Sequence, residues 1–291
     1  MAQNIILIET STALCSVALA ENGQITAYRE SSAPKAHASL TAVFIQEMLD
    51  ERGLTLADCD AVCVSKGPGS YTGLRVGVST AKGLCFGSKK PLLAVGTLDT
   101  LVAQSLCQPE CTCQPERNCH PERNCHPERN CHPEHNCHPE HNCHPERSEG
   151  SPYRFIIPMI DARRMEVYAA VFSPCHPESV CHPEFVCHPE RSEGSPSYRQ
   201  ITETAPAIID ETSFAEYLEQ GPCLFIGDGA GKCVDVIKHP NAHFCQCWPK
   251  ASAMLSPAMA ALNENRFEDV AYLEPFYLKE FVATVSKKKL F

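Results

Sequence analysis

Residues 65–77 read SKGPGSYTGLRVG, a glycine-rich turn between two stretches of different hydrophobic period. The residues before it, DAVCVSK at 60–66, form an apolar run of strand length, and LRVGVSTAKGLCFG at 74–87 has the pattern of a helix. The glycines permit tight backbone geometry, and Ser70 or Thr72 can cap the helix that follows. A strand, a glycine-rich turn and a helix in this order are typical of an α/β fold.

The role of this turn has two open interpretations. Exposed amides at the helix start could hold an anion or a phosphate, but no Gly-Lys-Ser/Thr follows at the spacing of a Walker loop. A turn used only for packing is the alternative, and the pattern alone favours it. The first apolar run ends in polar residues where many ATP-binding folds place an acid and hydroxyls, although a plain polar turn explains them equally well. The candidate anion- or nucleotide-binding residues are Glu9, Thr10, Ser11, Gly67, Gly69 and Ser70.

The helices on either side of the turn have faces suited to contact with another chain. HASLTAVFIQEMLDER at 37–52 carries a helical stripe of apolar residues that is closed by Gly53. The helix after the turn is rich in small residues, and such a flat face lets a second helix approach closely, so we expect an interface there. These small residues are Gly73, Gly77, Ser79, Ala81 and Gly83.

The rest of the chain repeats the order of the first part. An apolar strand at 4–10, an Asn22-Gly23 hairpin signal and a strand at 91–97 complete the first half. The second half predicts strands and helices in a similar sequence, which indicates two α/β lobes with mixed sheets. We expect lobes at 1–106 and 153–291. The predicted elements of the second half are strand–turn–strand at 154–172, a strand at 198–204, a helix at 213–220, a strand at 222–230 and a helix at 251–267.

Two tracts of Cys-His-Pro-Glu repeats, at 107–152 and 174–197, interrupt the second part of this pattern and hold most of the 13 histidines. Thiolate and imidazole are good zinc and copper ligands, but adjacent Cys-His pairs at a period of six define no single four-ligand cage. The decapeptide CHPERSEGSP occurs twice, which favours a copied insertion tolerated in exposed loops. We expect irregular surface loops and no metal site of functional importance.

No catalytic set can be assembled from the remaining polar residues. His37 begins a helix, but the position one turn later is Thr41, so the paired histidines of a metallohydrolase helix are missing. The charged turn of Asp161–Glu166 and the strand-to-glycine turn at Asp228 form no recognisable acid–base pair.

The overall composition limits the class of protein. The net charge of −10 argues against broad, nonspecific binding of nucleic acid by the chain alone. The opening residues, MAQNIILIET, do not have the pattern of a signal peptide, and no apolar run approaches the length of a membrane span. We therefore expect a cytoplasmic protein.

Five segments together resemble the bacterial TsaB (YeaZ) proteins. They are IILIETSTALCSVAL at 5–19, KAHASLTAVFIQEML at 35–49, VSKGPGSYTGLRVGVSTAKGL at 64–84, MIDARRMEVYAAVF at 159–172 and LEPFYLKEFVA at 273–283. The similarity covers nearly all of the chain outside the repeats, and the combination of GPGSYTGLR with DARR.EVY is specific. The repeats have no counterpart in the family.

The resemblance implies a two-lobed actin/Hsp70-like ATPase (ASKHA) fold and a non-catalytic role in making N6-threonylcarbamoyladenosine at position 37 of tRNA. The catalytic subunit of that system, TsaD, binds a metal through a His-x-x-x-His helix, which here reads His37 and Thr41. A TsaE-type ATPase, tRNA bound through the complex, and a homodimer are further implied partners, and ATP or ADP is expected at most at the level of the complex. The implied interface with TsaD uses His37, Leu40, Phe44, Met48, Tyr71, Leu74, Val78 and Lys82.

Three other functions remain as alternatives. They are a stand-alone ATPase, a metallopeptidase of the same fold, and a metal-binding protein that works through the repeats. Thr41 argues against the peptidase, and the lack of a clear catalytic acid argues against the ATPase.

Overall fold

The computed structural model describes residues 3–107, 152–175 and 198–278, and all structural statements concern these residues. Apart from their end residues, the two repeat tracts lie outside this part of the chain, as does the expectation that they form loops.

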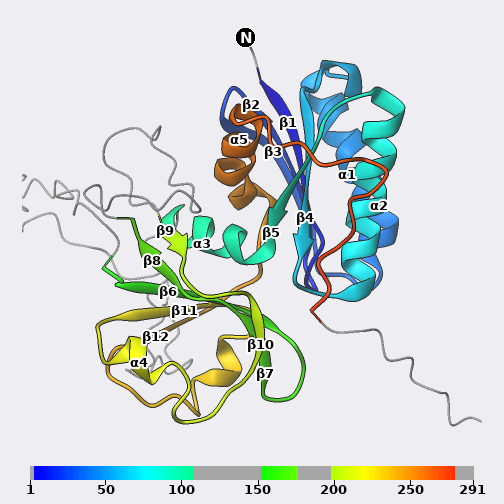
Figure 1. Cartoon of the computed structure of the whole chain (residues 1–291). Coiled ribbons are helices and arrows are strands. Elements are labelled where there is room, and N and C mark those ends of the chain that lie inside the picture. The colour runs from blue at the N-terminus through cyan, green and yellow to red at the C-terminus, as the bar shows by residue number, and fades with distance from the viewer. Residues whose placement is uncertain (1–2, 108–151, 176–197, 279–291) are drawn as a thin grey trace, which may run out of the picture.

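The first lobe is built on a five-stranded sheet of strand order β3-β2-β1-β4-β5 (Figure 1). β1 pairs antiparallel with β2 and parallel with β4, so the sheet is mixed, as predicted. The hairpin expected around Asn22-Gly23 joins β2 and β3. The elements are β1 (Asn4–Glu9), β2 (Cys15–Glu21), β3 (Gln24–Ser31), α1 (Ala36–Arg52), the 3-10 helix η1 (Leu56–Asp58), β4 (Ala61–Gly67), α2 (Tyr71–Ser88), β5 (Leu92–Gly96) and α3 (Thr97–Cys107).

The second lobe repeats this topology with the strand order β10-β7-β6-β11-β12. β8 and β9, which flank the second repeat tract, form an antiparallel pair beside β6, as expected for a hairpin. The elements are β6 (Phe155–Asp161), β7 (Glu166–Ala169), β8 (Phe172–Pro174), β9 (Tyr198–Gln200), β10 (Ala205–Ile208), α4 (Ala215–Leu218), β11 (Cys223–Gly227), η2 (Gly231–Cys233), β12 (Ala242–Gln246), η3 (Ala251–Met254) and α5 (Leu255–Asn263).

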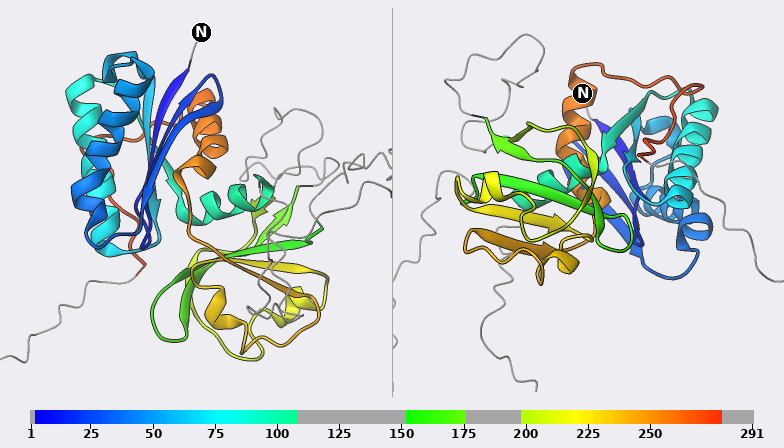
Figure 2. Two further views of the ribbon diagram at one scale, coloured as in Figure 1. Left: turned by 180° about the vertical axis from the view of Figure 1, so that it is seen from behind. Right: turned by 60° about the horizontal axis from the view of Figure 1, so that its bottom comes forward.

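Alternating side chains of β1 supply both faces of the first sheet. Ile6 and Ile8 pack with α1 and α2, whereas Ile5 and Leu7 pack with α5. Figure 2 shows α5 on the opposite side of the sheet from α1 and α2, so this sheet is covered on both faces. A strand buried on both sides reads as the continuous apolar run that the sequence contains.

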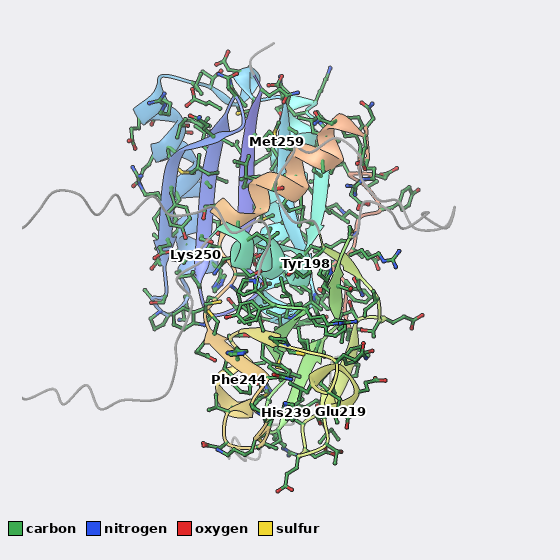
Figure 3. All side chains as sticks on the ribbon, turned by 90° about the vertical axis from the view of Figure 1, so that its left-hand side faces the viewer. Tyr198, Glu219, His239, Phe244, Lys250 and Met259 are labelled. Atoms are coloured by element: carbon green, nitrogen blue, oxygen red, sulfur yellow. The ribbon has the colours of Figure 1, made fainter. Side chains whose placement is uncertain are left out.

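The end of the chain returns to the first lobe, which the expected division at 106 and 153 did not include. Met254 and Ala258 belong to the core on one face of the first sheet, and Met259 lies over that sheet in Figure 3, away from Phe244 in the second lobe. Beyond α5, Glu268 forms a bridge with Leu92 of β5. The boundary between lobes is therefore crossed a second time, near Lys250.

Helix α3 connects the lobes and packs against the second sheet. Leu98 and Leu101 share a buried cluster with Ile156 and Ile160 of β6, and Gln104 Nε2 donates to the Trp248 carbonyl at 3.2 Å. The second lobe departs from the prediction in detail: β12 was not predicted, and the helix expected at 213–220 is a single turn, α4. No helix among the described residues is both long and apolar enough to span a bilayer.

Candidate functional site

The glycine-rich turn docks on the end of β1. The Ser70 amide donates to the Ser11 carbonyl at 2.6 Å, and Ser70 Oγ accepts from the Gly73 amide at 3.4 Å as the cap of α2. A Cβ on Gly69 would lie 2.3 Å from the Ser11 carbonyl oxygen. Only glycine permits this approach of two backbones.

The first glycines of α2 also face inward. A Cβ on Gly73 would lie 2.1 Å from the Thr10 carbonyl oxygen, and one on Gly77 would lie 2.2 Å from Thr10 Oγ1. Thr10 Oγ1 in turn donates to the Gly73 carbonyl at 2.9 Å. Gly73 and Gly77, with the buried Ala81, therefore serve close packing of α2 on the sheet and are not part of an outer flat face.

The structure brings most of the candidate anion-binding residues together but uses them for internal contacts, whereas Gly67 faces Phe276 and Leu74. Ser11 meets Gly69 and Ser70 of the turn, Thr10 meets Gly73 and Gly77 of α2, and the Ser70 amide is taken by the Ser11 carbonyl of the chain itself. A carbonyl oxygen therefore occupies the position that an anion would need at this amide. This geometry favours the packing interpretation of the turn.

Glu9 is fully buried at the centre of this contact. Its Oε1 accepts from the Ser11 amide at 2.7 Å. Desolvation raises the pKa of the carboxyl to about 7, although hydrogen bonds from Ser11 act in the opposite direction. No described residue bonds Glu9 Oε2, Ser11 Oγ or Thr12 Oγ1. A carboxyl closed off from solvent in this way cannot reach a substrate in this conformation.

His37 contacts the turn between β1 and β2, and Thr41 is engaged by its own helix. His37 Nε2 lies 2.9 Å from the Thr12 carbonyl oxygen, and Thr41 Oγ1 donates to the His37 carbonyl at 2.6 Å. The Thr41 side chain is buried beside Cys15 Sγ, at 3.4 Å. Within the described ranges, no three His, Cys, Asp or Glu side chains lie close enough to hold a metal ion.

The expected interface residues divide into two sets. Met48, Leu74 and Val78 are buried, and Met48 and Val78 belong to the core beneath α1 and α2, so their side chains cannot contact a partner. The apolar stripe of a helix marks the side that meets its own sheet. His37, Leu40, Phe44, Tyr71 and Lys82 are partly exposed.

The outer face of α1 and α2 is formed by residues that the sequence did not fully identify. Phe86 is 84% exposed and Val43 is 45% exposed. A Cβ at Gly83 or Gly87 would meet nothing within 4 Å, so neither glycine has a packing role within this chain. A glycine in a helix interior is destabilising relative to alanine by roughly 0.5–1 kcal/mol. We call Val43, Gly83, Phe86 and Gly87 the outer helix face.

The C-terminal strap, residues 268–278, bounds this region on one side. Lys82 Nζ donates to the carbonyls of Ala271 and Leu273 at 3.0 and 3.1 Å, so the ammonium group expected to meet a partner is held by the chain itself. The rings of Tyr71 and Tyr277 lie 4.7 Å apart. Sequence pattern contained no signal for the strap, because its contacts join residues almost 200 positions apart.

Two hollows lie near the turn, and only the smaller is lined by residues of the turn itself. The smaller, of about 280 Å³, lies between the lobes and is lined by Lys66, Gly67, Pro68, Gly96, Leu98, Asp99, Gln200, Thr204 and Phe276. Typical small-molecule sites have volumes of roughly 300–1,000 Å³, so the volume of this hollow is slightly below that range. The larger, of about 620 Å³, is an open hollow formed mainly by the C-terminal strap.

Comparison with known proteins finds relatives of the N-terminal part of the chain. A family model described as TsaD, tRNA N6-adenosine threonylcarbamoyltransferase, matches residues 29–117. The tRNA threonylcarbamoyladenosine biosynthesis protein TsaB of Escherichia coli K12 is 38% identical over 97 residues, which cover 33% of this chain and 42% of the relative. The protein of the same name from Haemophilus influenzae is 41% identical over 105 residues, 35% of this chain and 44% of the relative. These matches span less than half the length of the relatives.

A solved structure extends the likeness to both lobes. YeaZ from Pseudomonas aeruginosa superposes with a TM-score of 0.66 at 21% sequence identity, covering 95% of this chain and 100% of that one. The structural likeness shows a shared mixed α/β fold, and the sequence matches link the N-terminal part to relatives named TsaB. In sequence, the N-terminal part of the chain is therefore similar to proteins named TsaB, and its fold is similar to that of YeaZ.

Proposed function

We propose that this chain is a non-catalytic subunit of the complex that makes N6-threonylcarbamoyladenosine at position 37 of tRNA. In this role it binds and activates a TsaD-type catalytic paralogue through the outer helix face. A TsaE-type ATPase and tRNA join the complex, and a homodimer through the same face competes with it. The names of the sequence relatives support the pathway.

The observation that carries the interface is the exposed Phe86 beside two unpacked glycines. Phe86 is 84% exposed on α2, and Gly83 and Gly87 leave open space on the same helix. An exposed aromatic residue next to small residues suits insertion of a partner side chain and close approach of a partner helix. Neither feature benefits the isolated chain.

The non-catalytic role is supported by the state of the candidate catalytic groups. Thr41 stands where a second metal-binding histidine would be needed, and its hydroxyl is bonded to its own helix. Glu9 is buried, which also weakens the alternative of a stand-alone ATPase. The metal-binding alternative depends on the repeats, which lie outside the described residues.

Binding of the TsaD-type paralogue to the purified chain tests this proposal. Phe86→Glu and Gly83→Arg should each weaken binding at least tenfold, because they place a charge or a bulky side chain in the contact. Ile208→Glu is the matched control, since Ile208 is 76% exposed on the edge strand of the other lobe. Equal binding by wild type and both α2 variants would refute the interface. Loss of binding in the Ile208 variant would move it to the second lobe.

A further inference from the structure

The turn between β6 and β7 carries two adjacent arginines that the proposed interface does not use. Arg163 and Arg164 are exposed at the tip of this turn, which projects from the end of the second lobe (Figure 1). No described residue forms an ion pair with either guanidinium group. The chain as a whole has a net charge of −10, so these two positive charges contrast with its overall charge.

The backbone conformation of this turn does not favour arginine at either position. Arg163 has a φ of 71° and Arg164 a φ of 51°, so both are in the left-handed region. Glycine and asparagine are the favoured residues there, and another L-residue costs roughly 1–2 kcal/mol in the left-handed region. The conformation therefore gives no reason for two arginines, which points to a use for their side chains.

The turn is held in place by groups other than the two guanidinium groups. Lys232 Nζ bonds Asp161 Oδ1 and donates to the Arg164 and Glu166 carbonyls at 2.8 and 2.5 Å. Asp161 Oδ1 accepts from the Arg163 amide at 3.0 Å, and the Asp161 amide donates to Asp228 Oδ1 at 2.9 Å. The nearest lysine and aspartate are thus engaged with each other and with the backbone. Both arginine side chains remain available on a fixed support.

We propose that Arg163 and Arg164 bind backbone phosphates of RNA, so that the second lobe contacts tRNA while the first lobe binds the catalytic paralogue. This inference rests on the proposed function for the identity of the RNA. Guanidinium groups form charge-assisted, often bidentate hydrogen bonds with phosphate. Such contacts position a nucleic acid without reading its sequence, which suits a subunit that need not recognise bases.

The test is tRNA binding over a series of salt concentrations, with the full chain alone and with its TsaD-type paralogue. The probe is a transcript of a tRNA that reads codons beginning with A. Arg163→Asn/Arg164→Gly removes both charges while placing favoured residues in the left-handed positions, so it should fold at least as well as wild type. We expect it to weaken binding about tenfold and to lower the slope of log K against log salt by about 1.5.

The matched control is Arg199→Ala/Lys238→Ala, which removes two exposed positive charges elsewhere in the second lobe. An equal loss of binding in the control would show a general charge effect and overturn the proposal. So would an unchanged salt slope in the Asn/Gly variant, or no RNA binding by either the chain or the complex. Displacement of the RNA from the wild type by millimolar pyrophosphate or ATP, with the Asn/Gly variant insensitive, would assign the turn to a free phosphate compound instead.

Failure of this inference is distinguishable from failure of the proposed function. If the paralogue does not bind, the measurement on the chain alone still decides the RNA contact. If the paralogue binds but the arginine pair has no effect on RNA, the interface remains and only the RNA contact is lost.

Discussion

The two lobes have the same strand order but differ in the segment that follows the central parallel strand, β4 in the first lobe and β11 in the second. In the first lobe, β4 leads through the turn at Gly67–Ser70 into the long helix α2, and the adjoining end of β1 is completely buried. In the second lobe, β11 leads into a three-residue 3-10 helix, η2, and the adjoining end of β6 is exposed and charged. One topology thus provides a closed junction beneath a helix face in one lobe and an open charged turn in the other.

This difference indicates how a two-lobed fold can be divided between two tasks. The buried junction of Glu9, Thr10 and Ser11 fixes α2 on its sheet, which presents the outer helix face. The open junction around Asp161 fixes a turn with free arginines. The hollow of about 280 Å³ between the lobes is a weaker candidate for a functional site than the outer helix face or the arginine turn.

The largest expected effect is a loss of stability on replacing one closely packed glycine in each junction. Gly73→Ala places a Cβ 2.1 Å from the Thr10 carbonyl oxygen, and Gly227→Ala places one 2.1 Å from the Met159 carbonyl oxygen. Each should lower the free energy of unfolding by about 3 kcal/mol through overpacking, with Gly227→Ala the more severe because its φ is 129°. Urea denaturation measures both. A loss below about 1 kcal/mol in either lobe would mean that its junction is looser than described.

The second effect is a pH dependence of stability, which should differ between the closed junction of the first lobe and the open junction of the second. The folded pKa of Glu9, about 7, lies above its ordinary value of 4.5. Its contribution to stability is therefore complete below pH 4.5 and is lost as the pH rises through about 7. Glu9→Gln cannot ionise and keeps an acceptor for the Ser11 amide. At pH 8 it should be more stable than wild type by on the order of 3 kcal/mol.

The control for this prediction is the same pair of proteins at pH 4, where the difference should vanish. Asp228→Asn provides the counterpart in the second lobe. Burial raises the pKa of Asp228 to about 6, so its pH-dependent gain should be smaller and begin at lower pH. A Glu9→Gln variant with no pH-dependent gain would show that the carboxyl is solvated.

A smaller effect distinguishes the two sets of glycines within α2. Gly83→Ala should stabilise the chain by about 0.5–1 kcal/mol, because the added Cβ meets nothing and the helix loses a flexible residue. Thermal unfolding alongside Gly73→Ala tests this contrast directly. Destabilisation by Gly83→Ala would indicate that this side of α2 is packed against part of the chain that the structure does not describe.

The smallest effect concerns His37. His37→Gln removes a hydrogen bond to the Thr12 carbonyl and should lower stability by no more than about 1 kcal/mol. Metal content, measured by mass spectrometry on a chain without the repeats, should be unchanged. A drop in bound metal would restore His37 as a ligand.

The sequence predicted the arrangement of strands and helices better than the direction of side chains. Alternation and helical spacing indicated two related α/β lobes, because each lobe forms from local segments with clear periods. The resemblance assigned Met48, Leu74 and Val78 to an interface, but these residues lie inside, on the side of each helix that helical spacing marks as buried. The phase of α2 could have separated Gly73 and Gly77 from Gly83, since residues four apart share a face.

Other features depend on contacts that no local pattern contains. The strap holds Lys82 through carbonyls at Ala271 and Leu273, far away in the sequence. The buried state of Glu9 follows from the docking of a separate turn onto β1. The short strand β12 was missed because its five residues form a strand only beside β11.

The most direct test is synthesis of threonylcarbamoyladenosine in a reconstituted system containing the TsaD-type and TsaE-type proteins and tRNA. The chain is supplied as wild type, Glu9→Gln or Gly83→Arg. We predict that Glu9→Gln supports the wild-type rate and that Gly83→Arg, although folded, reduces the rate at least tenfold. Activity that is lost with Glu9→Gln but kept with Gly83→Arg would contradict the account and place the working part of the chain at the junction around Glu9.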